Sequence, residues 1–277
     1  MKRLVLLSLT AVTFVAPALG AVTLGMAETF AVLGASTVTN TGVTEIRGNL
    51  GVSPGTAIVG FPPGILQIGT IHAADAVARE AQADLTKAYN YAAAMPCDFQ
   101  MTGEDLGGLT LAPGVYCFDT SAQLTGALVL DFQNGSNGSF IFQIGSTLTT
   151  ASASTVSLAN CTQHCLVVWQ VGSSATLGTS TKFSGDIMAK ASITLTTDVN
   201  LCGRALALTG AVTMDTDVVF FMGSLTPPAS AMATGNGLTM VPAPNYLDRD
   251  SIGAGEAAQD TQETGDRSKE SVDESRE

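Results

Sequence analysis

The sequence has little charge and lacks the common catalytic motifs. Asp, Glu, Lys and Arg make up 13% of its 277 residues, and the formal net charge is −12. An acidic chain of this kind is a poor partner for nucleic acid or for anionic membrane surfaces. There are only two histidines, and there is no G-x-S-x-G, P-loop or H-E-x-x-H motif. We therefore expect no enzyme, no cofactor and no metal.

No internal apolar run approaches the length of a membrane span, although the mean hydropathy is +0.31. The N-terminus has the pattern of a secretory signal peptide, with Lys2 and Arg3, an apolar core from Leu4 to Val15, and the small residues 18–20. An N-terminal anchor is the alternative, but the apolar part is short for a bilayer. We predict that residues 1–20 are removed and that the protein is secreted, with no membrane contact in the mature form.

Five cysteines fit an oxidising compartment, but the odd number leaves one thiol over. Cys97 and Cys117 bracket a glycine-rich stretch and are the favoured pair. Cys161 and Cys165, in "CTQHC", could close a small loop. Cys202 would then be a buried free thiol.

The composition changes after Pro242. Residues 245–277 hold ten acidic and four basic residues and almost no apolar residues to bury, so we expect them to be disordered. The segment is either a solvated tail or an interaction tail. We divide the mature chain into a folded domain over 21–224 and a linker with an acidic tail over 225–277.

One segment reads clearly as a helix. Residues 72–95, "HAADAVAREAQADLTKAYNYAAAM", are rich in alanine without Gly or Pro, and Pro96 ends them. Apolar residues recur at spacings of three and four, at Ala74, Val77, Ala81, Leu85, Ala88 and Ala92. Such a stripe of mostly small side chains can lie close against a flat surface.

The rest reads as short strands separated by Gly, Asn and Ser. After Ser139, units of three strands recur, and each begins with a strand that is apolar on both faces: "FIFQI", "LVVWQV", "DIMAK" and "RALAL". Such a strand must be covered on both sides, and the helix is the available second cover. Three strands per turn of about 18 residues predict a triangular β-solenoid with one helix-covered face and two open faces.

The second strand of each unit repeats a threonine phrase: "STLTT", "SATLGT", "SITLTT" and "AVTMDT". If Thr147, Thr176, Thr194 and Thr213 are equivalent, the steps are 29, 18 and 19 residues. Alternation then turns Leu148, Leu177, Leu195 and Met214 inward and the threonines outward, with Thr149, Gly178, Thr196 and Asp215 beside them. The third strands would expose Lys182, Asp198, Asn200 and Asp217, whereas the threonine face carries a single charge.

Columns of hydroxyl and methyl groups on such a face form a flat, regular lattice. A flat surface cannot enclose a small ligand, but it can order a layer of water, and ice is a partner with a matching two-dimensional repeat. Threonine is also simply a good strand residue, which is the alternative explanation. Exposed strands usually carry Lys and Glu, and this face has hardly any charge, which favours a functional role.

Several stretches closely resemble the DUF3494 ice-binding protein family, in order along residues 24–221. They are "FAVLGASTVTNTGVTEIRGNLGVSPGTAIVGFPPG" (30–64), "DLGGLTLAPGVYCF" (105–118), "FIFQIGSTLTT" (140–150), "WQVGSSATLGTSTKFSGDIMA" (169–189) and "GRALALTGAVTMD" (203–215).

The resemblance implies a discontinuous right-handed β-solenoid, whose N-terminal strands stack against the C-terminal coils and whose helix packs alongside. It also implies that the flat face next to the helix-covered face binds ice, so that the partner is an ice surface and the protein slows ice growth and recrystallisation. We expect a monomer, because the helix already covers the most apolar face. The expected ice-binding residues are Thr37, Thr39, Gln123, Thr125, Thr147, Thr149, Thr176, Thr194, Thr196 and Thr213.

Two other functions stay open. Right-handed β-helices also host polysaccharide hydrolases and lyases, and Asp215 and Asp217 could act as acid and base. We expect these two to lie on either side of a coil corner, His72 to be a helix cap or surface residue, and His164 to be a turn residue. The second alternative is a non-enzymatic extracellular adhesion or matrix module on the same scaffold.

Overall fold

The computed structural model describes residues 22–133, 138–162 and 165–221, all within one compact unit. The expected signal peptide, His164 and the acidic tail lie outside the described residues, so the expectations for them stay predictions. Within the three described ranges, no helix combines the length and the apolar character that crossing a membrane takes.

The described chain folds into three β-sheets, here called A, B and C, in which the paired strands run parallel. Sheet A has nine strands. In spatial order they are β7 (Ile71–Ala73), β4 (Asn49–Val52), β1 (Phe30–Gly34), β22 (Ala205–Ala207), β19 (Asp186–Ala189), β16 (Leu166–Val171), β13 (Ser139–Ile144), β10 (Gly114–Phe118) and β8 (Phe99–Gln100).

Sheet B has seven strands. In spatial order they are β5 (Ala57–Val59), β2 (Thr37–Thr41), β23 (Val212–Asp215), β20 (Ile193–Leu195), β17 (Ala175–Leu177), β14 (Leu148–Thr150) and β11 (Ala122–Leu124).

Sheet C has eight strands. In spatial order they are β6 (Ile65–Ile68), β3 (Glu45–Arg47), β24 (Val218–Phe220), β21 (Asn200–Cys202), β18 (Lys182–Ser184), β15 (Thr155–Ala159), β12 (Ala127–Asp131) and β9 (Thr110–Leu111).

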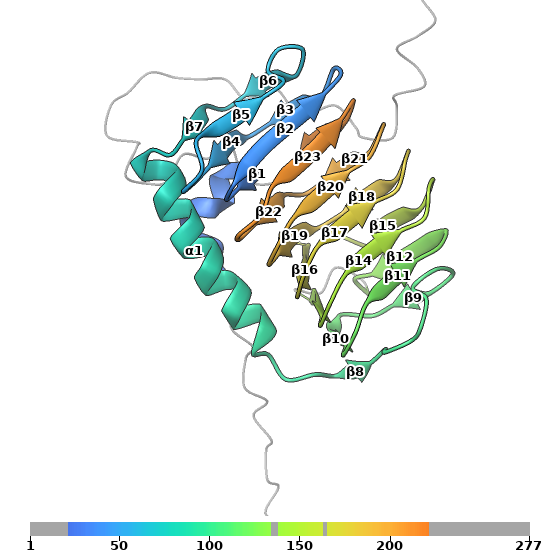
Figure 1. Cartoon of the computed structure of the whole chain (residues 1–277). Coiled ribbons are helices and arrows are strands. Elements are labelled where there is room, and N and C mark those ends of the chain that lie inside the picture. Colours follow the sequence, from blue (N-terminus) through green and yellow to red (C-terminus); the bar gives the residue numbers. More distant parts are fainter. Residues whose placement is uncertain (1–21, 134–137, 163–164, 222–277) are drawn as a thin grey trace, which may run out of the picture. The chain divides into compact units, whose positions relative to one another are not determined.

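Each complete coil therefore visits A, B and C in turn, as the three-strand units predicted. The order of coils in space differs from their order in the chain (Figure 1). The first coil, β1 to β3, pairs with the last, β22 to β24, for example through Val32 and Ala205 and through Thr39 and Thr213. The discontinuous solenoid is thus confirmed, while its right-handedness stays a prediction.

Helix α1 (Ala76–Ala93) runs along the outer face of sheet A (Figure 1). Its 18 residues span about 27 Å, and neighbouring strands lie about 4.8 Å apart, so the helix crosses between five and six strands. It carries the chain from β7, at one end of sheet A, toward β8, at the other end. The helix is therefore both the cover of sheet A and the connection that makes the discontinuous order possible.

Side-chain amides fasten the helix to the sheet. Gln82 Nε2 donates to the carbonyl oxygens of Gly34 and Ala207, at 3.1 and 3.0 Å. Gln143 Nε2, on β13, donates to the carbonyl oxygens of Ala92 and Met95, at 2.7 and 2.8 Å. The last carbonyl groups of a helix have no hydrogen-bond partner within the helix, so Gln143 supplies a donor to carbonyl groups at that end.

Two layers of apolar side chains follow from this arrangement. The larger fills the space between the three sheets and contains the stacked rings of Phe142 and Trp169, whose centroids are 3.8 Å apart. The smaller lies between sheet A and α1 and includes Leu85, Ile141 and Leu206. The first strands of the units are covered on both sides, as their sequence predicted.

The helix begins later than expected. Residues 71–73 form β7, where His72 pairs with Gly51, and the helix starts after Asp75, whose carboxylate accepts a hydrogen bond of 2.8 Å from the Ala78 amide. The predicted start at His72 is therefore wrong. His72 is a strand residue whose Nδ1 lies 2.7 Å from the Asp75 carboxylate, so it supports the cap from outside the helix.

Cys97 and Cys117 form a disulfide, and so do Cys161 and Cys165. Cys202, on β21, is free, as expected, but it is only partly buried. Burial, followed by the negative charge of Asp186, raises the pKa of Cys202 to about 11. Because the thiolate is the reactive form, little of Cys202 is in that form at neutral pH.

Candidate functional site

The outward face of sheet B carries a column of side chains that crosses all seven of its strands. The pairing of neighbouring strands aligns one outward-facing residue of each strand with one outward-facing residue of the adjacent strand. In spatial order the column contains Gln123, Thr149, Thr176, Thr194, Thr213, Thr39 and Val59. Neighbouring members lie roughly 4.8 Å apart, as adjacent strands do. This set is called the central column below.

The structure corrects the predicted alignment of the threonine phrases at β14. Thr149, and not Thr147, pairs with Thr176, so the first step of the repeat is 27 residues. Leu148 is aligned with Ala175, and Thr150 takes the inward position that Leu177 and Leu195 hold in the next coils.

Thr150 is buried because its hydroxyl finds internal partners. It lies 3.1 Å from the hydroxyl of Thr181 and accepts a hydrogen bond of 2.9 Å from the Gly178 amide. A buried hydroxyl with such partners costs little, so polarity alone did not reveal which way Thr150 faces.

A column of small residues lies two positions before the central column in each coil. Thr147 belongs to this column. Its hydroxyl lies 2.8 Å from the hydroxyl of Ser121 on one side, and on the other side the amide of Leu148, the residue after Thr147, donates to the carbonyl of Ser174. Thr37 is aligned with Ala57 in the same column. This leading column contains Ser121, Thr147, Ser174, Ser192, Ala211, Thr37 and Ala57.

A third column lies two positions after the central one. It contains Thr125, Ala151, Gly178, Thr196, Asp215 and Thr41. All ten residues predicted for the site therefore lie on the outward side of sheet B, in one of three columns. The sequence analysis missed Val59 and the serines of the leading column, although two of the threonine phrases begin with serines of that column, Ser174 and Ser192, and could have indicated it.

The face carries one charge among the residues of these three columns, that of Asp215. Its carboxylate accepts hydrogen bonds from Thr197 at 2.7 Å and Thr216 at 3.2 Å, both from hydroxyl groups at the edge of the sheet. Within the central column, Thr39 donates to the hydroxyl of Thr213 at 3.3 Å. The face is thus a nearly uncharged array of short hydroxyl and methyl groups.

A row of buried polar side chains lies under the corner where sheet B turns into sheet C. Pairing in sheet C aligns Ser154, Thr181, Val199, Asp217 and Thr44 in that order, and each of the four polar residues has 0% of its surface exposed. The predicted exposure of Asp217 is therefore wrong. Its carboxylate accepts hydrogen bonds from the amides of Val199 and Asp215, at 2.7 and 2.8 Å. Burial raises the pKa of Asp217 to about 7, and these hydrogen bonds oppose that shift.

The two aspartates do not form a catalytic pair. Asp215 lies on the outward side of sheet B, whereas Asp217 is buried in the corner and bonded to backbone amides. A general acid and base must both reach the substrate, which the buried Asp217 cannot do. Among the described residues, no three His, Cys, Asp or Glu side chains are grouped so as to hold a metal ion.

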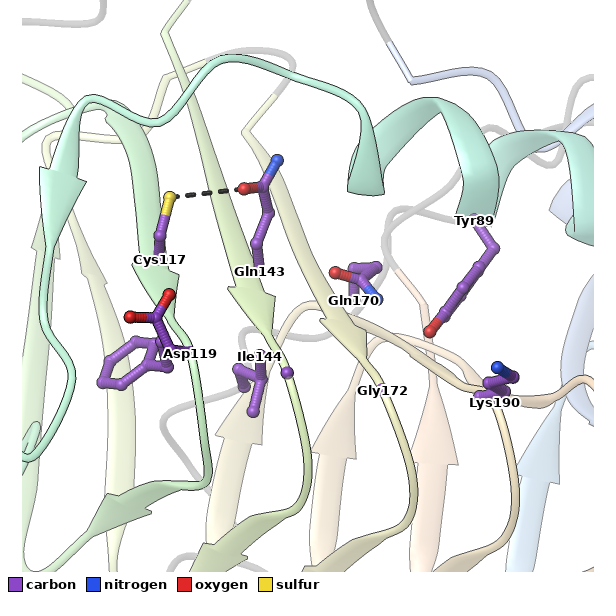
Figure 2. Close-up of a pocket in the computed structure, with 10 residues that line it drawn as sticks. Tyr89, Cys117, Asp119, Gln143, Ile144, Gln170, Gly172 and Lys190 are labelled. Carbon is purple, nitrogen blue, oxygen red and sulfur yellow. Dashed lines mark hydrogen bonds between the residues drawn. The ribbon is translucent and has the colours of Figure 1, made fainter.

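A shallow depression of about 460 Å³ lies beside α1 at the border of sheet A (Figure 2). Two of the polar residues that line it, Tyr89 and Gln143, help to hold the helix on sheet A. Tyr89 donates to the Val171 carbonyl at 3.2 Å, the Gln143 amide nitrogen bonds the helix end, and Cys117 is in a disulfide, with its sulfur 3.2 Å from Gln143 Oε1. The depression is therefore structural, and the flat face of sheet B is the candidate site.

Comparison with known proteins agrees with this fold. A family model described as ice-binding-like matches residues 32–220. An ice-binding protein of Nostoc sp. (strain HG1) is 57% identical over 197 residues, which cover 71% of this chain and 72% of that protein.

Two solved structures are also similar. An ice-binding protein from an Antarctic biological consortium has 44% identity and a TM-score of 0.70, with 76% of this chain and 96% of that chain covered. An ice-binding protein from the Antarctic ascomycete Antarctomyces psychrotrophicus has 35% identity and a TM-score of 0.68, with 73% and 98% covered. The chain therefore belongs to the ice-binding-like family.

Proposed function

We propose that this protein binds ice through the outward face of sheet B and thereby inhibits ice growth and recrystallisation. The observation that carries the proposal is the central column, in which threonines of five consecutive strands stand in continuous register between Gln123 and Val59. The ice-binding residues proposed are the ten predicted from the sequence, together with Ser121, Ser174, Ser192 and Val59.

The physical argument is one of order and rigidity. Strands that lie roughly 4.8 Å apart, with outward residues roughly 6.7 Å apart along each strand, give a two-dimensional lattice. Methyl groups favour a caged water layer and hydroxyl groups anchor it, so the face can hold water in positions that suit a crystal. The side chains are short and stand on a paired sheet, so little conformational entropy remains to be lost on binding.

The relatives favour this function over the alternatives. The Nostoc protein and both solved structures are named as ice-binding proteins. An adhesion or matrix module on the same scaffold has no such support. A hydrolase or lyase would need an accessible carboxylate pair, and Asp215 and Asp217 do not provide one.

We further propose that the protein acts outside the cell, after removal of residues 1–20. The two disulfides support an oxidising compartment. The same proposal assigns ice binding to the folded domain, residues 21–224, and treats residues 225–277 as a linker with an acidic tail.

The test compares two identical substitutions on different sheets. Thr194→Tyr places a bulky ring in the central column, whereas Thr155→Tyr places it at an outward position of sheet C. We expect Thr194→Tyr to abolish most inhibition of ice recrystallisation and Thr155→Tyr to leave it unchanged, with both proteins folded by circular dichroism. Equal activity in the two variants would move the site away from sheet B, and an inactive but folded parent protein would refute ice binding.

A further inference from the structure

The strands at one end of the solenoid carry no charged side chains of their own. Residues 48–74 contain no Asp, Glu, Lys or Arg. They form β4 to β7, and three of these strands, β7, β5 and β6, are the outermost strands of sheets A, B and C. In the described part of the chain, no strand pairs with their outer edges.

The same strands expose large apolar side chains. Ile65, Ile68 and Ile71 are 47%, 49% and 46% exposed. Edge strands of natural proteins are usually protected by charged residues, because an open edge invites pairing with another chain. This end has both an open edge on each sheet and apolar side chains around it, so it is suited to contact with another protein surface.

The opposite end of the solenoid differs sharply. Residues 96–131, which include β8, β9 and β11, contain five acidic residues and no Lys or Arg. The acidic residues are Asp98, Glu104, Asp105, Asp119 and Asp131. Two copies of this acidic end repel each other, and an acidic end placed against the apolar end would lose its hydration without gaining a counter-charge.

We infer that two copies of this chain associate through the end formed by β5, β6 and β7. A second copy brings the same uncharged, apolar surface, so no charge loses its hydration in the contact. It also brings three open strand edges, which are the partners that open strand edges bind. Contact between identical ends gives a closed two-fold dimer, which cannot extend into a filament because the acidic ends remain outside.

This inference replaces the expectation of a monomer, which rested on the helix covering sheet A. The helix covers one side of the solenoid, but β5, β6 and β7 lie at its end. The inference does not depend on ice binding, since sheet B plays no part in the argument beyond its outermost strand.

The test is sedimentation equilibrium of the whole chain, whose monomer mass is 28.3 kDa. We expect a species of twice that mass that persists in high salt, because an uncharged contact is not screened. Ile68→Lys should convert it to monomer, and Ile71→Lys, on another sheet, should do the same. The matched control is Ala127→Lys, which adds the same charge at an exposed position of sheet C near the acidic end.

The outcomes of this experiment show whether two copies associate through β5, β6 and β7. A parent chain that stays monomeric at high protein concentration overturns the inference, and so does a dimer that survives both isoleucine substitutions. A dimer lost in Ala127→Lys would place the contact at the acidic end and would also overturn it. Thermal unfolding of the variants shows whether loss of the dimer reflects loss of the fold.

Discussion

The hydroxyl of Thr150 lies 3.1 Å from the hydroxyl of Thr181, in the buried interior under the corner between sheets B and C. Its neighbour Thr149 points outward in the central column. Two adjacent threonines therefore serve different purposes. One belongs to the surface array, and the other satisfies polar groups inside the solenoid.

This difference gives a prediction about stability. Thr150→Val removes a hydroxyl that pairs with Thr181 and accepts from the Gly178 amide, so it should lower the free energy of unfolding by about 1–3 kcal/mol. Thr149→Val, with the same change of atoms, should stay within about 0.5 kcal/mol of the parent. Urea unfolding of both variants measures this. Equal losses would show that Thr150 gains nothing from its internal partners.

Asp217 predicts a dependence of stability on pH. Its pKa rises from 3.8 to about 7 on folding, mainly through burial, so between these values the folded state binds more protons than the unfolded state. The free energy of unfolding should therefore fall as the pH rises from about 4 to about 7, by up to about 4 kcal/mol, and this contribution should be constant above that range.

Asp217→Thr isolates this effect, because Thr181 and Thr44 occupy the equivalent corner positions of other coils. The melting temperature of the parent should decline across the window, and the decline should be much smaller in the variant. Identical pH profiles for the two proteins would show that Asp217 does not titrate in this range.

Asp215 predicts a gain in activity. It is the charged residue of the three columns, and a carboxylate orders water around itself rather than in the pattern of the hydroxyl and methyl groups. Asp215→Thr should therefore improve the inhibition of ice recrystallisation, measured as a lower protein concentration at the endpoint. Asp198→Thr is the control, since it removes an exposed acid outside the columns and places threonine where the next coil has Thr216.

Much of the architecture could be predicted because a solenoid converts a sequence period into neighbours in space. The steps of 18 and 19 residues between Thr176, Thr194 and Thr213 correspond directly to paired strands. The strands that are apolar on both faces predicted that the helix, α1, packs on the outer face of their sheet. The stacking of β1 to β3 on β22 to β24 has no such local signal, and it was expected only from the resemblance to a family.

The errors share a physical cause. Thr150, Asp217 and His72 are polar residues that pair with residues of other coils, at Thr181, Val199 and Gly51, so their own polarity did not indicate their position. Val59 was missed for the opposite reason, because an apolar residue in a strand is usually assigned to the core. Its register with Thr39 places it in the central column instead.

The position of the first coil beside the last has a consequence for the order of folding. Val32 pairs with Ala205, so strands made at the start of synthesis meet their partner only when the described chain is almost complete. Contacts across such a separation carry a large cost in chain entropy before they form, which slows folding. The solenoid therefore cannot simply grow coil by coil from its N-terminus. The pairing of β1 to β3 with β22 to β24 can form only after the last coil has been synthesised.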